Sequence, residues 1–433
     1  MSGPTHRIPK VELENFNYKK DIANRSLLSS LNAFELEILK EIIYSSLKFP
    51  LKELLSSLHI DEPVISPFLS RLTALGLLKI DSGVVFVDKD LRRFFEFQLS
   101  KFEGDFEPNT DYLQTLLQQV PIHVLPTWYA MPKNTDDIFA SIIEKHLFTP
   151  KIYQKYLHEI AFEHPRQQEI MLAVLESKEH SLPASYLKKK FKLSDSEFLE
   201  CLLYLEYSFV CFSIFAETEN GFEERIVPLH EWKTWLEFHI KTQCKPLNSS
   251  SIQRNHPSDF GFVEEMSTII AGSKNTHFLA NSLMNRLSTL SYTEKGTATA
   301  AGKEWVTKPL QEKSMILYLH EMNRLRRGDG KFTDKDVREI EKSLKRVLKT
   351  GWVFLDDFLK GFYATVGSAS PVTLKKQGKH WNFALPKYNE SEQEFITNTV
   401  MTFFFEAGIT ATGMFEGKPC FTLTPFGQVT LGD

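Results

Sequence analysis

Cysteine is scarce in this 433-residue sequence. Its four cysteines (Cys201, Cys211, Cys244 and Cys420) lie far apart, and no Cys-x-x-Cys pair occurs. This distribution argues against a disulfide framework or a zinc site and favours reduced thiols, as in cytoplasmic proteins. Long apolar runs are also absent, since none approaches the roughly 18–20 residues of a membrane span. The first ten residues lack the apolar segment of a secretory signal. We therefore expect a soluble cytoplasmic protein without a membrane partner.

Motifs of the common enzyme classes are missing as well. The sequence has no GxxxxGK[ST] phosphate-binding loop and no serine within GxSxG. His158 and His164 flank a stretch that resembles a zinc-protease motif, but they are six residues apart, whereas HExxH places its histidines four apart on one helical face. A calcium loop with Gly330 as its invariant glycine would have Leu325 as its first ligand, which excludes calcium binding. We expect no enzymatic activity, no metal and no cofactor, and a hydrolase is the least favoured alternative.

Charge of one sign is not in excess. The chain carries 51 Lys/Arg and 55 Asp/Glu, for a formal net charge of −4. No global field therefore draws it to nucleic acid or to an anionic membrane. A nucleic-acid role would need a local basic face. The chain is also too long for a single core, and its length indicates two to four domains.

The clearest local pattern covers residues 165–227. An apolar-periodic helix (PRQQEIMLAVLE) and a short helix (ASYLKKKF) come first, and Ser194 with Glu197 then forms the capping box of a third helix. Two β-prone runs follow and flank Asn220-Gly221, the strongest short signal for a hairpin. Three short helices and a two-stranded hairpin make up a winged helix.

The same plan repeats along the chain. Asn32 and Glu35 form a capping box that opens an earlier winged helix. Thr-x-x-Gly ends two later modules, at 299–302 and at 424–427. We predict a mainly α fold with small β-hairpins (α+β), built from tandem winged-helix-like modules joined by helical segments. The expected boundaries are 1–25 for a polar tail, 26–95 for winged helix 1, 96–163 for a helical connector, 164–244 for winged helix 2, 245–259 for a linker, 260–307 for a degenerate winged-helix-like module, 308–350 for a basic helical segment, and 351–433 for a C-terminal winged helix with an irregular, partly basic insertion at 367–388.

Several stretches between about residues 115 and 433 carry a family resemblance. They are LQQVPIHVLPTWYAMPKNTDDIFASIIEKHL, PRQQEIMLAVLE, a module that ends in Thr-x-x-Gly and Trp, GWVFLDDFL, and FTLTPFGQVTL. Together they resemble bacterial helicase-associated proteins, which share a domain similar to the N-terminal region of XPB-type helicases and to winged-helix subunits of transcription factor IIH. The resemblance implies association with DNA repair or transcription machinery and a helicase or transcription component as partner. It does not imply a helicase, because the phosphate-binding loop is missing, and it does not include the first winged helix.

Local basic groups are the candidates for nucleic-acid contact. A stripe of cations at helical spacing runs through residues 333–349, and other cations precede it or lie in the late insertion. Such groups can neutralise phosphates. The candidates are Lys335, Arg338, Lys342, Lys345 and Lys349 in the stripe, Arg324, Arg326 and Arg327 before it, and Lys375, Lys376 and Lys379 in the insertion. A solvated helix face with ion pairs three or four residues apart explains the stripe equally well.

The third helices of the modules argue against reading of base sequence. Base edges are normally contacted by Arg, Lys, Asn or Gln of this helix. The central module instead has Asp195, Glu197 and Glu200 there, and the first has Glu62, Ser66, Ser70 and Arg71. We therefore expect a non-enzymatic accessory or scaffold protein whose winged helices dock protein and whose basic helix contacts nucleic acid weakly and without sequence preference. The alternatives are a sequence-specific transcription regulator and an adaptor that binds no nucleic acid.

Overall fold

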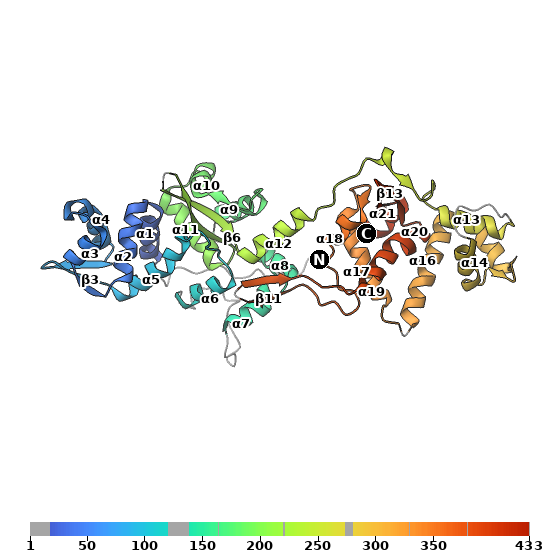
Figure 1. Cartoon of the computed structure of the whole chain (residues 1–433), viewed down its shortest axis with the longest axis horizontal. Coiled ribbons are helices and arrows are strands. Elements are labelled where there is room, and N and C mark those ends of the chain that lie inside the picture. Colours follow the sequence, from blue (N-terminus) through green and yellow to red (C-terminus); the bar gives the residue numbers. More distant parts are fainter. Residues whose placement is uncertain are drawn as a thin grey trace. The chain divides into compact units, whose positions relative to one another are not determined.

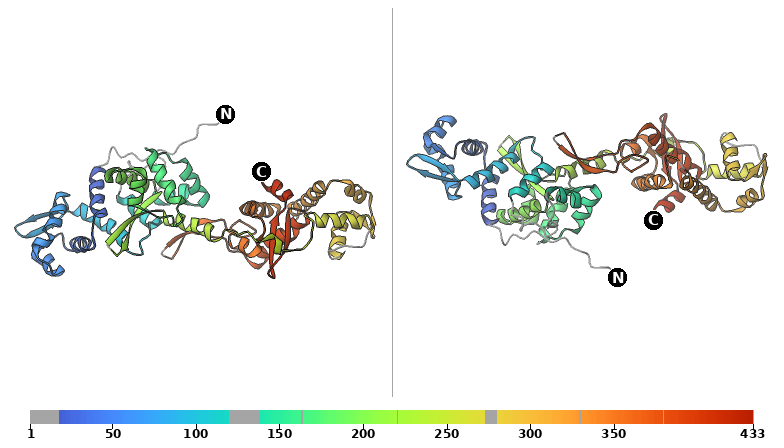
Figure 2. Two further views of the ribbon diagram at one scale, coloured as in Figure 1. Left: turned by 90° about the horizontal axis from the view of Figure 1, so that it is seen from above. Right: turned by 90° about the horizontal axis from the view of Figure 1, so that it is seen from below.

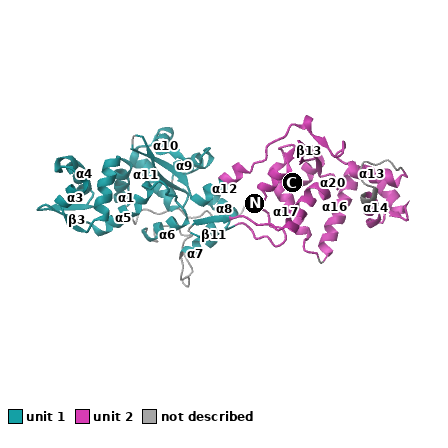
Figure 3. Ribbon diagram, viewed as in Figure 1, with its two compact units in different colours: residues 1–236, 373–383 teal, residues 237–372, 384–433 magenta. Residues whose placement is uncertain are grey.

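The computed structural model describes residues 18–119, 138–162, 164–219, 221–272, 280–328, 330–378 and 380–432 (Figure 1). The chain forms two compact units, unit 1 with residues 1–236 and 373–383 and unit 2 with residues 237–372 and 384–433 (Figure 3). The architecture is mainly α with small antiparallel sheets, which confirms the predicted fold class. Among the described helices, none combines the length and apolar composition that a membrane span requires.

Three modules share the winged-helix order of a helix, a short strand, two helices and a hairpin. In each module the short strand pairs with the second hairpin strand, so the sheets have the orders β1-β3-β2, β4-β6-β5 and β10-β14-β13-β7. In each module, a residue with positive φ lies between the third helix and the hairpin. These residues are Gly76, Phe209 and Gly408. A backbone turn of this kind ends the helix and starts the hairpin.

The first module opens with the predicted Asn32–Glu35 capping box, which the structure confirms. Its elements are α2 (Ala33–Tyr44), β1 (Lys48–Pro50), α3 (Leu51–Leu58), α4 (Glu62–Ala74), β2 (Leu78–Asp81) and β3 (Val84–Val87). The helix α1 (Tyr18–Ser29) precedes the module, and α5 (Lys89–Leu99) and η1 (Ser100–Phe102) follow it. Its core shares one apolar cluster with Phe215 of the central module, so the two modules pack together within unit 1.

The central module contains the longest hairpin of the described chain (Figure 2). Its elements are α9 (Pro165–Glu176), β4 (Leu182–Pro183), α10 (Ala184–Phe191), α11 (Asp195–Tyr207), β5 (Cys211–Thr218) and β6 (Gly221–Pro228). The Ser194–Glu197 capping box and the hairpin are confirmed, whereas Asn220 of the predicted turn lies outside the described residues. The helices α6 (Thr110–Gln119), α7 (Ile138–Ile142), η4 (Ile143–Leu147), α8 (Pro150–Glu159) and α12 (His230–Lys241) surround it. Residues 120–137, which carry much of the first resembling stretch, are also outside the described ranges.

Unit 2 contains the degenerate module and the C-terminal winged helix. The former comprises α13 (Gly261–Ile270), α14 (Ala280–Thr289), β8 (Thr293–Glu294), β9 (Thr297–Ala298) and α15 (Ala300–Thr307), and α16 (Leu310–Arg327) follows it. The C-terminal module comprises α17 (Asp334–Leu344), η6 (Lys345–Val347), β10 (Val353–Phe354), α18 (Leu355–Lys360), α19 (Glu390–Asn398), η7 (Thr399–Phe403), α20 (Phe404–Glu406), β13 (Thr410–Phe415), β14 (Lys418–Leu423) and α21 (Pro425–Gly432). The basic helix α17 is thus the first helix of this winged helix rather than part of a separate segment, because Val337, Ile340 and Leu344 are buried in the module's own core.

The repeated Thr-x-x-Gly pattern has one structural cause in both modules. The hydroxyl groups of Thr299 and Thr424 accept hydrogen bonds from the backbone N–H of Gly302 and Gly427, at 3.1 and 2.9 Å, and so cap the helix after the hairpin. A Cβ atom on either glycine would lie 2.3 or 2.0 Å from a backbone carbonyl oxygen. Threonine supplies the cap, and glycine allows the helix to approach the hairpin backbone.

The predicted linker is an ordered part of the C-terminal module. After η5 (Ser249–Ser251), β7 (Gln253–Arg254) pairs with β13 at the sheet edge. The backbone N–H of Asn255 donates to the carbonyl of Thr412 at 2.9 Å. The division between the two units falls at residues 236 and 237 instead. Linker composition is misleading here, because the edge strand β13 offers unpaired backbone groups that the segment satisfies.

The late insertion forms a hairpin, β11 (Thr373–Gln377) and β12 (His380–Ala384), whereas the sequence predicts an irregular segment. The hairpin belongs to unit 1. The indole N–H of Trp381 donates to the Asp111 carboxylate at 3.0 Å, and the Lys376 ammonium pairs with the same oxygen at 3.0 Å. The backbone N–H of Leu374 donates to the carbonyl of Phe148 at 2.7 Å. Asp111 is therefore the polar anchor of the hairpin.

Replacing Asp111 by alanine is expected to loosen this hairpin. Both side-chain contacts would be lost, at about 1 kcal/mol of local stability, so the open state would become roughly fivefold more populated. Limited trypsin digestion should cut after Lys375 and Lys376 about fivefold faster than in the unaltered protein. Asp105→Ala, a nearby exposed carboxylate, should leave the cleavage rate unchanged. Equal rates in the two variants would contradict the anchoring role.

Candidate nucleic-acid interface and a polar cavity

Four cations of the basic stripe lie on the outer face of α17 and η6, and the fifth, Lys349, lies in the turn that follows η6. The side chains opposite this outer face, Val337, Ile340 and Leu344, are buried, which directs the stripe to solvent. All of its cations are exposed: Lys335, Arg338, Lys342, Lys345 and Lys349. The structure therefore places these five predicted residues together on one surface.

The carboxylates around the stripe are partly engaged elsewhere. Glu341 accepts a hydrogen bond from the Tyr318 hydroxyl at 2.6 Å, and the burial of Glu341 raises its pKa. Glu339 pairs with Lys342 at 2.5 Å, the kind of contact expected on a solvated helix face. Lys335 and Lys349 form no ion pair within the described ranges. These two lysines lie at opposite ends of the stripe, since Lys335 is in the first turn of α17 and Lys349 follows η6.

The other candidate cations are in less favourable positions. Arg324 pairs with Glu321 at 2.5 Å and Arg326 with Asp334 at 3.2 Å, whereas Arg327 is exposed beside them. In the insertion, Lys376 pairs with Asp111, Lys375 is exposed, and Lys379 lies outside the described residues. The insertion cations belong to unit 1 and the stripe to unit 2, so the structure does not join them in one module.

The third helices of the modules present acids to solvent. Exposed carboxylates are Glu62 on α4, Asp195 and Glu197 on α11, and Glu390 and Glu394 on α19. The cations on third helices are engaged within the protein. Arg71 of α4 pairs with Glu35 at 2.7 Å. In the degenerate module, Arg286 of α14, the helix that precedes the β8–β9 pair, likewise pairs with Glu321 and Glu406. The third helix of the central module, α11, lacks the donors that base edges in the major groove require. In the C-terminal module, α19 carries Gln393, which donates to the carbonyl of Tyr388, and the exposed Asn398.

One further basic surface was missed by sequence reasoning. Lys48, Phe86 and Lys79 lie opposite one another across β1, β3 and β2, and Phe86 is 38% exposed. The Lys48 ammonium lies 5.2 Å from the centre of the Phe86 ring. An aromatic ring between two cations is typical of surfaces that bind single strands. The alternation of exposed and buried side chains along these strands is the signal that could have identified it.

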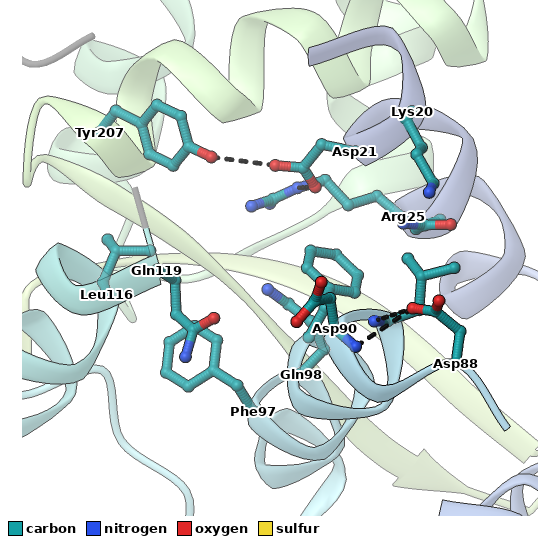
Figure 4. A pocket seen from close by; sticks show the side chains of 13 residues that line it. Lys20, Asp21, Arg25, Asp88, Asp90, Phe97, Gln98, Leu116, Gln119 and Tyr207 are labelled. Carbon is teal, nitrogen blue, oxygen red and sulfur yellow. Dashed lines mark hydrogen bonds and ion pairs between the residues drawn. The ribbon is translucent and has the colours of Figure 1, made fainter. Parts of the chain in front are cut away.

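Unit 1 also contains an open cavity of about 400 Å³ (Figure 4). Its walls come from α1, α5 and α6, and Tyr207 of α11 closes one side. The lining combines charged, amide and aromatic side chains. Asp88, at one edge, caps α5 by accepting the backbone N–H groups of Asp90 and Leu91.

A buried ion cluster lies directly beside this cavity. Arg25 donates to Asp21 at 2.8 Å and to Glu206 at 2.7 Å, and Lys101 donates to the other oxygen of Glu206 at 2.7 Å. Tyr207 donates to the second oxygen of Asp21 at 2.9 Å. Burial alone would raise the pKa of Glu206, but the two cations outweigh burial and hold this pKa at about 2. The cluster is charge-balanced and ties α1 and η1 to α11.

Within the described ranges, no group of three or more His, Cys, Asp or Glu side chains is placed to hold a metal ion. The four cysteines are buried and unpaired. No protein-family model, curated protein or solved structure that was compared with the chain matches it.

Proposed function

We propose that this chain is a non-enzymatic accessory or scaffold protein of a nucleic-acid machine. Its stripe on α17 and η6 contacts the phosphate backbone weakly and without sequence preference. The observation that carries this proposal is the alignment of four exposed cations along α17 and η6, with a fifth, Lys349, in the turn that follows. Phosphate contacts of this kind position a protein on nucleic acid but carry no sequence information.

The exposed acids on the third helices support the second half of the proposal, which is protein docking. Exposed carboxylates such as Glu62 and Glu197 repel phosphate and complement a basic protein surface, whereas Asp195 pairs with Lys188 at 2.6 Å. Beside α4, the first module has a groove of about 410 Å³ lined by Glu62, Ser66 and Ile80, among others. The first and central modules therefore serve as docking modules, and the C-terminal module serves as the nucleic-acid contact.

The machine is proposed to act in DNA repair or transcription. This part rests on the resemblance of about residues 115–433 to bacterial helicase-associated proteins. The partner in this view is a helicase or a transcription component located in the cytoplasm.

Reversing the charge of Lys342, Lys345 and Lys349 to glutamate is expected to weaken nucleic-acid binding strongly. The measurement is fluorescence anisotropy with random-sequence duplex DNA, single-stranded DNA and RNA at 50 and 200 mM salt. Five phosphate contacts predict a slope of about −4.5 for log K against log salt on duplex DNA. The triple variant should bind at least tenfold more weakly at the lower salt.

A control variant distinguishes the effect of these three positions from the effect of the change in net charge. Lys151, Lys178 and Lys303 are exposed and lie elsewhere, and their replacement by glutamate changes the net charge by the same amount. This control should retain most of the affinity. Unchanged binding by the α17 variant would rule out the backbone role of the stripe. Absence of binding at 50 mM salt would favour the adaptor alternative, and tight binding to one palindromic site would favour a sequence-specific regulator.

A further inference from the structure

The cavity between α1, α5 and α6 has the features of a small-ligand site, which is unrelated to nucleic-acid contact. Its volume of about 400 Å³ lies within the range of small-molecule pockets. All of its walls belong to unit 1, and the side chains at its edge are held in place. Asp88 is fixed by its cap on α5, and Tyr207 by its hydrogen bond to Asp21 (Figure 4).

The side-chain oxygens of two buried amides of the cavity wall lack hydrogen-bond partners. Asn24 and Gln98 are each 2% exposed, and the oxygens Asn24 Oδ1 and Gln98 Oε1 have no partner among the described residues. A buried polar atom without a partner costs about 1–3 kcal/mol. Such groups are rare in folded proteins, and a ligand that donates hydrogen bonds accounts for them.

The polar and charged side chains of the cavity wall determine which kind of ligand fits. The unpartnered buried atoms are both acceptors, so the ligand must donate. The charged lining comprises two cations, Lys20 and Arg25, and three carboxylates, Asp21, Asp88 and Asp90. Arg25 and Asp21 pair with each other, and Arg25 also pairs with Glu206, so the remaining charged lining is Lys20 against Asp88 and Asp90. Positive charge is therefore favoured in the cavity and negative charge is disfavoured.

The remaining wall is apolar and aromatic. Phe94 and Phe97 of α5 line it together with Leu91 and Leu116. Phe97 is itself stacked on Tyr112, with ring centres 4.8 Å apart and an interplanar angle of 11°, which holds the ring in place. Aromatic faces of this kind attract planar cations. We propose that the cavity binds a small planar cation, an amidinium or guanidinium group on an apolar body, through Asn24, Gln98 and Asp90.

Three nearly isosteric probes test the charge and donor requirement. Benzamidine, benzamide and benzoate share one ring and differ in the charge of the substituent. Ligand-observed NMR titration of the full chain should give a Kd of about 1 mM for benzamidine, in line with a ligand of its size. Benzamide and benzoate should bind at least tenfold more weakly. Equal binding of all three, or no binding of benzamidine, would overturn the proposal.

Variants distinguish a ligand role from a structural role. Gln98→Leu removes an unpartnered buried acceptor, so it should raise the melting temperature while weakening benzamidine binding at least tenfold. Asp90→Asn should weaken binding about threefold without changing stability. Gln114→Leu, an exposed position on α6 outside the cavity, should change neither quantity by as much. Unaltered benzamidine binding in Gln98→Leu would contradict the proposal.

Two competitor compounds then distinguish whether the bound guanidinium group belongs to a free small molecule or to a partner protein. Agmatine represents a free guanidinium compound, and an Nα-acetylated arginine methylamide represents an arginine side chain of a partner protein. Displacement of benzamidine by agmatine alone would identify a free small molecule, and stronger displacement by the arginine derivative would identify a protein partner. Displacement by neither would restrict the site to amidinium compounds with an aromatic body.

Discussion

Replacing Glu206 by glutamine is expected to lower the free energy of unfolding of unit 1 by about 3–5 kcal/mol. Glu206 is fully buried and is the shared carboxylate of Arg25 and Lys101, at 2.7 Å from each. Glutamine has nearly the same shape but no charge, so in the variant Arg25 keeps only Asp21 as ion-pair partner and Lys101 keeps only the attraction of Glu224. The cost arises because the remaining charge is neither solvated nor paired. Calorimetric or denaturant-induced unfolding of the full chain measures it.

Two further variants show whether charge balance is the cause. Glu200→Gln lies on the same helix but is partly exposed, and it should shift stability by less than about 0.5 kcal/mol. Combining Glu206→Gln with Lys101→Met removes one charge of each sign and should recover part of the lost stability. If the double variant is as unstable as the sum of the two single variants, the pairing argument is wrong.

The same cluster gives stability a defined dependence on acid pH. The pKa of Glu206 is about 2 in the folded protein, below its ordinary value of 4.5. A lowered carboxylate pKa stabilises the fold above pH 4.5, and that stabilisation is lost as the pH falls toward 2. Glu206 therefore contributes no slope to stability between pH 5 and pH 8.

Elements that depend on short-range signals were predictable from the sequence. The capping boxes at Asn32 and Ser194 fix helix starts through residues only three positions apart, and both are confirmed. The stripe on α17 also follows from helical periodicity. The apolar residues of its buried opposite face, such as Val337 and Ile340, recur at helical spacing in the sequence. Local periodicity determines which side of a helix faces the core, and this rule requires no knowledge of distant contacts.

Elements that depend on distant partners were not predictable. Glu206 follows an apolar helical stripe, and nothing near it in the sequence indicates burial, because Arg25 lies 181 residues away and Lys101 105 residues away. The insertion looks irregular because its anchor, Asp111, is 270 residues from Trp381. The cavity is likewise assembled from three helices whose sequences contain no ligand motif.

The second large effect concerns Glu231 of α12, whose carboxyl group is expected to make the protein less stable as the pH rises from about 4.5 to 7. Its side chain is 1% exposed, and Oε1 accepts the backbone N–H of Thr110 at 2.8 Å, while Oε2 has no partner among the described residues. Burial raises the pKa of Glu231 to about 7, and the Thr110 N–H offsets only part of this effect. Nearby Asp111 adds to the rise in pKa.

The direction of this pH dependence follows from the number of protons that the folded and unfolded states bind. Between pH 4.5 and 7 the folded protein keeps the Glu231 proton and the unfolded chain has lost it, so stability falls with rising pH. A difference of about 2.5 pKa units corresponds to about 3 kcal/mol by pH 8. Denaturation curves of the full chain between pH 5 and pH 8 measure this slope, in a window where Glu206 does not titrate.

Glu231→Gln should remove that slope. Glutamine keeps the acceptor for Thr110 and carries no titratable proton, so the variant should match the unaltered protein at pH 5 and exceed it by about 1–3 kcal/mol at pH 8. Glu103→Gln, an exposed carboxylate in the same unit, should leave the pH profile unchanged. A Glu231→Gln profile parallel to that of the unaltered protein would show that Glu231 is ionised in the fold. Its Oε2 atom would then require a cationic partner, which no described residue provides.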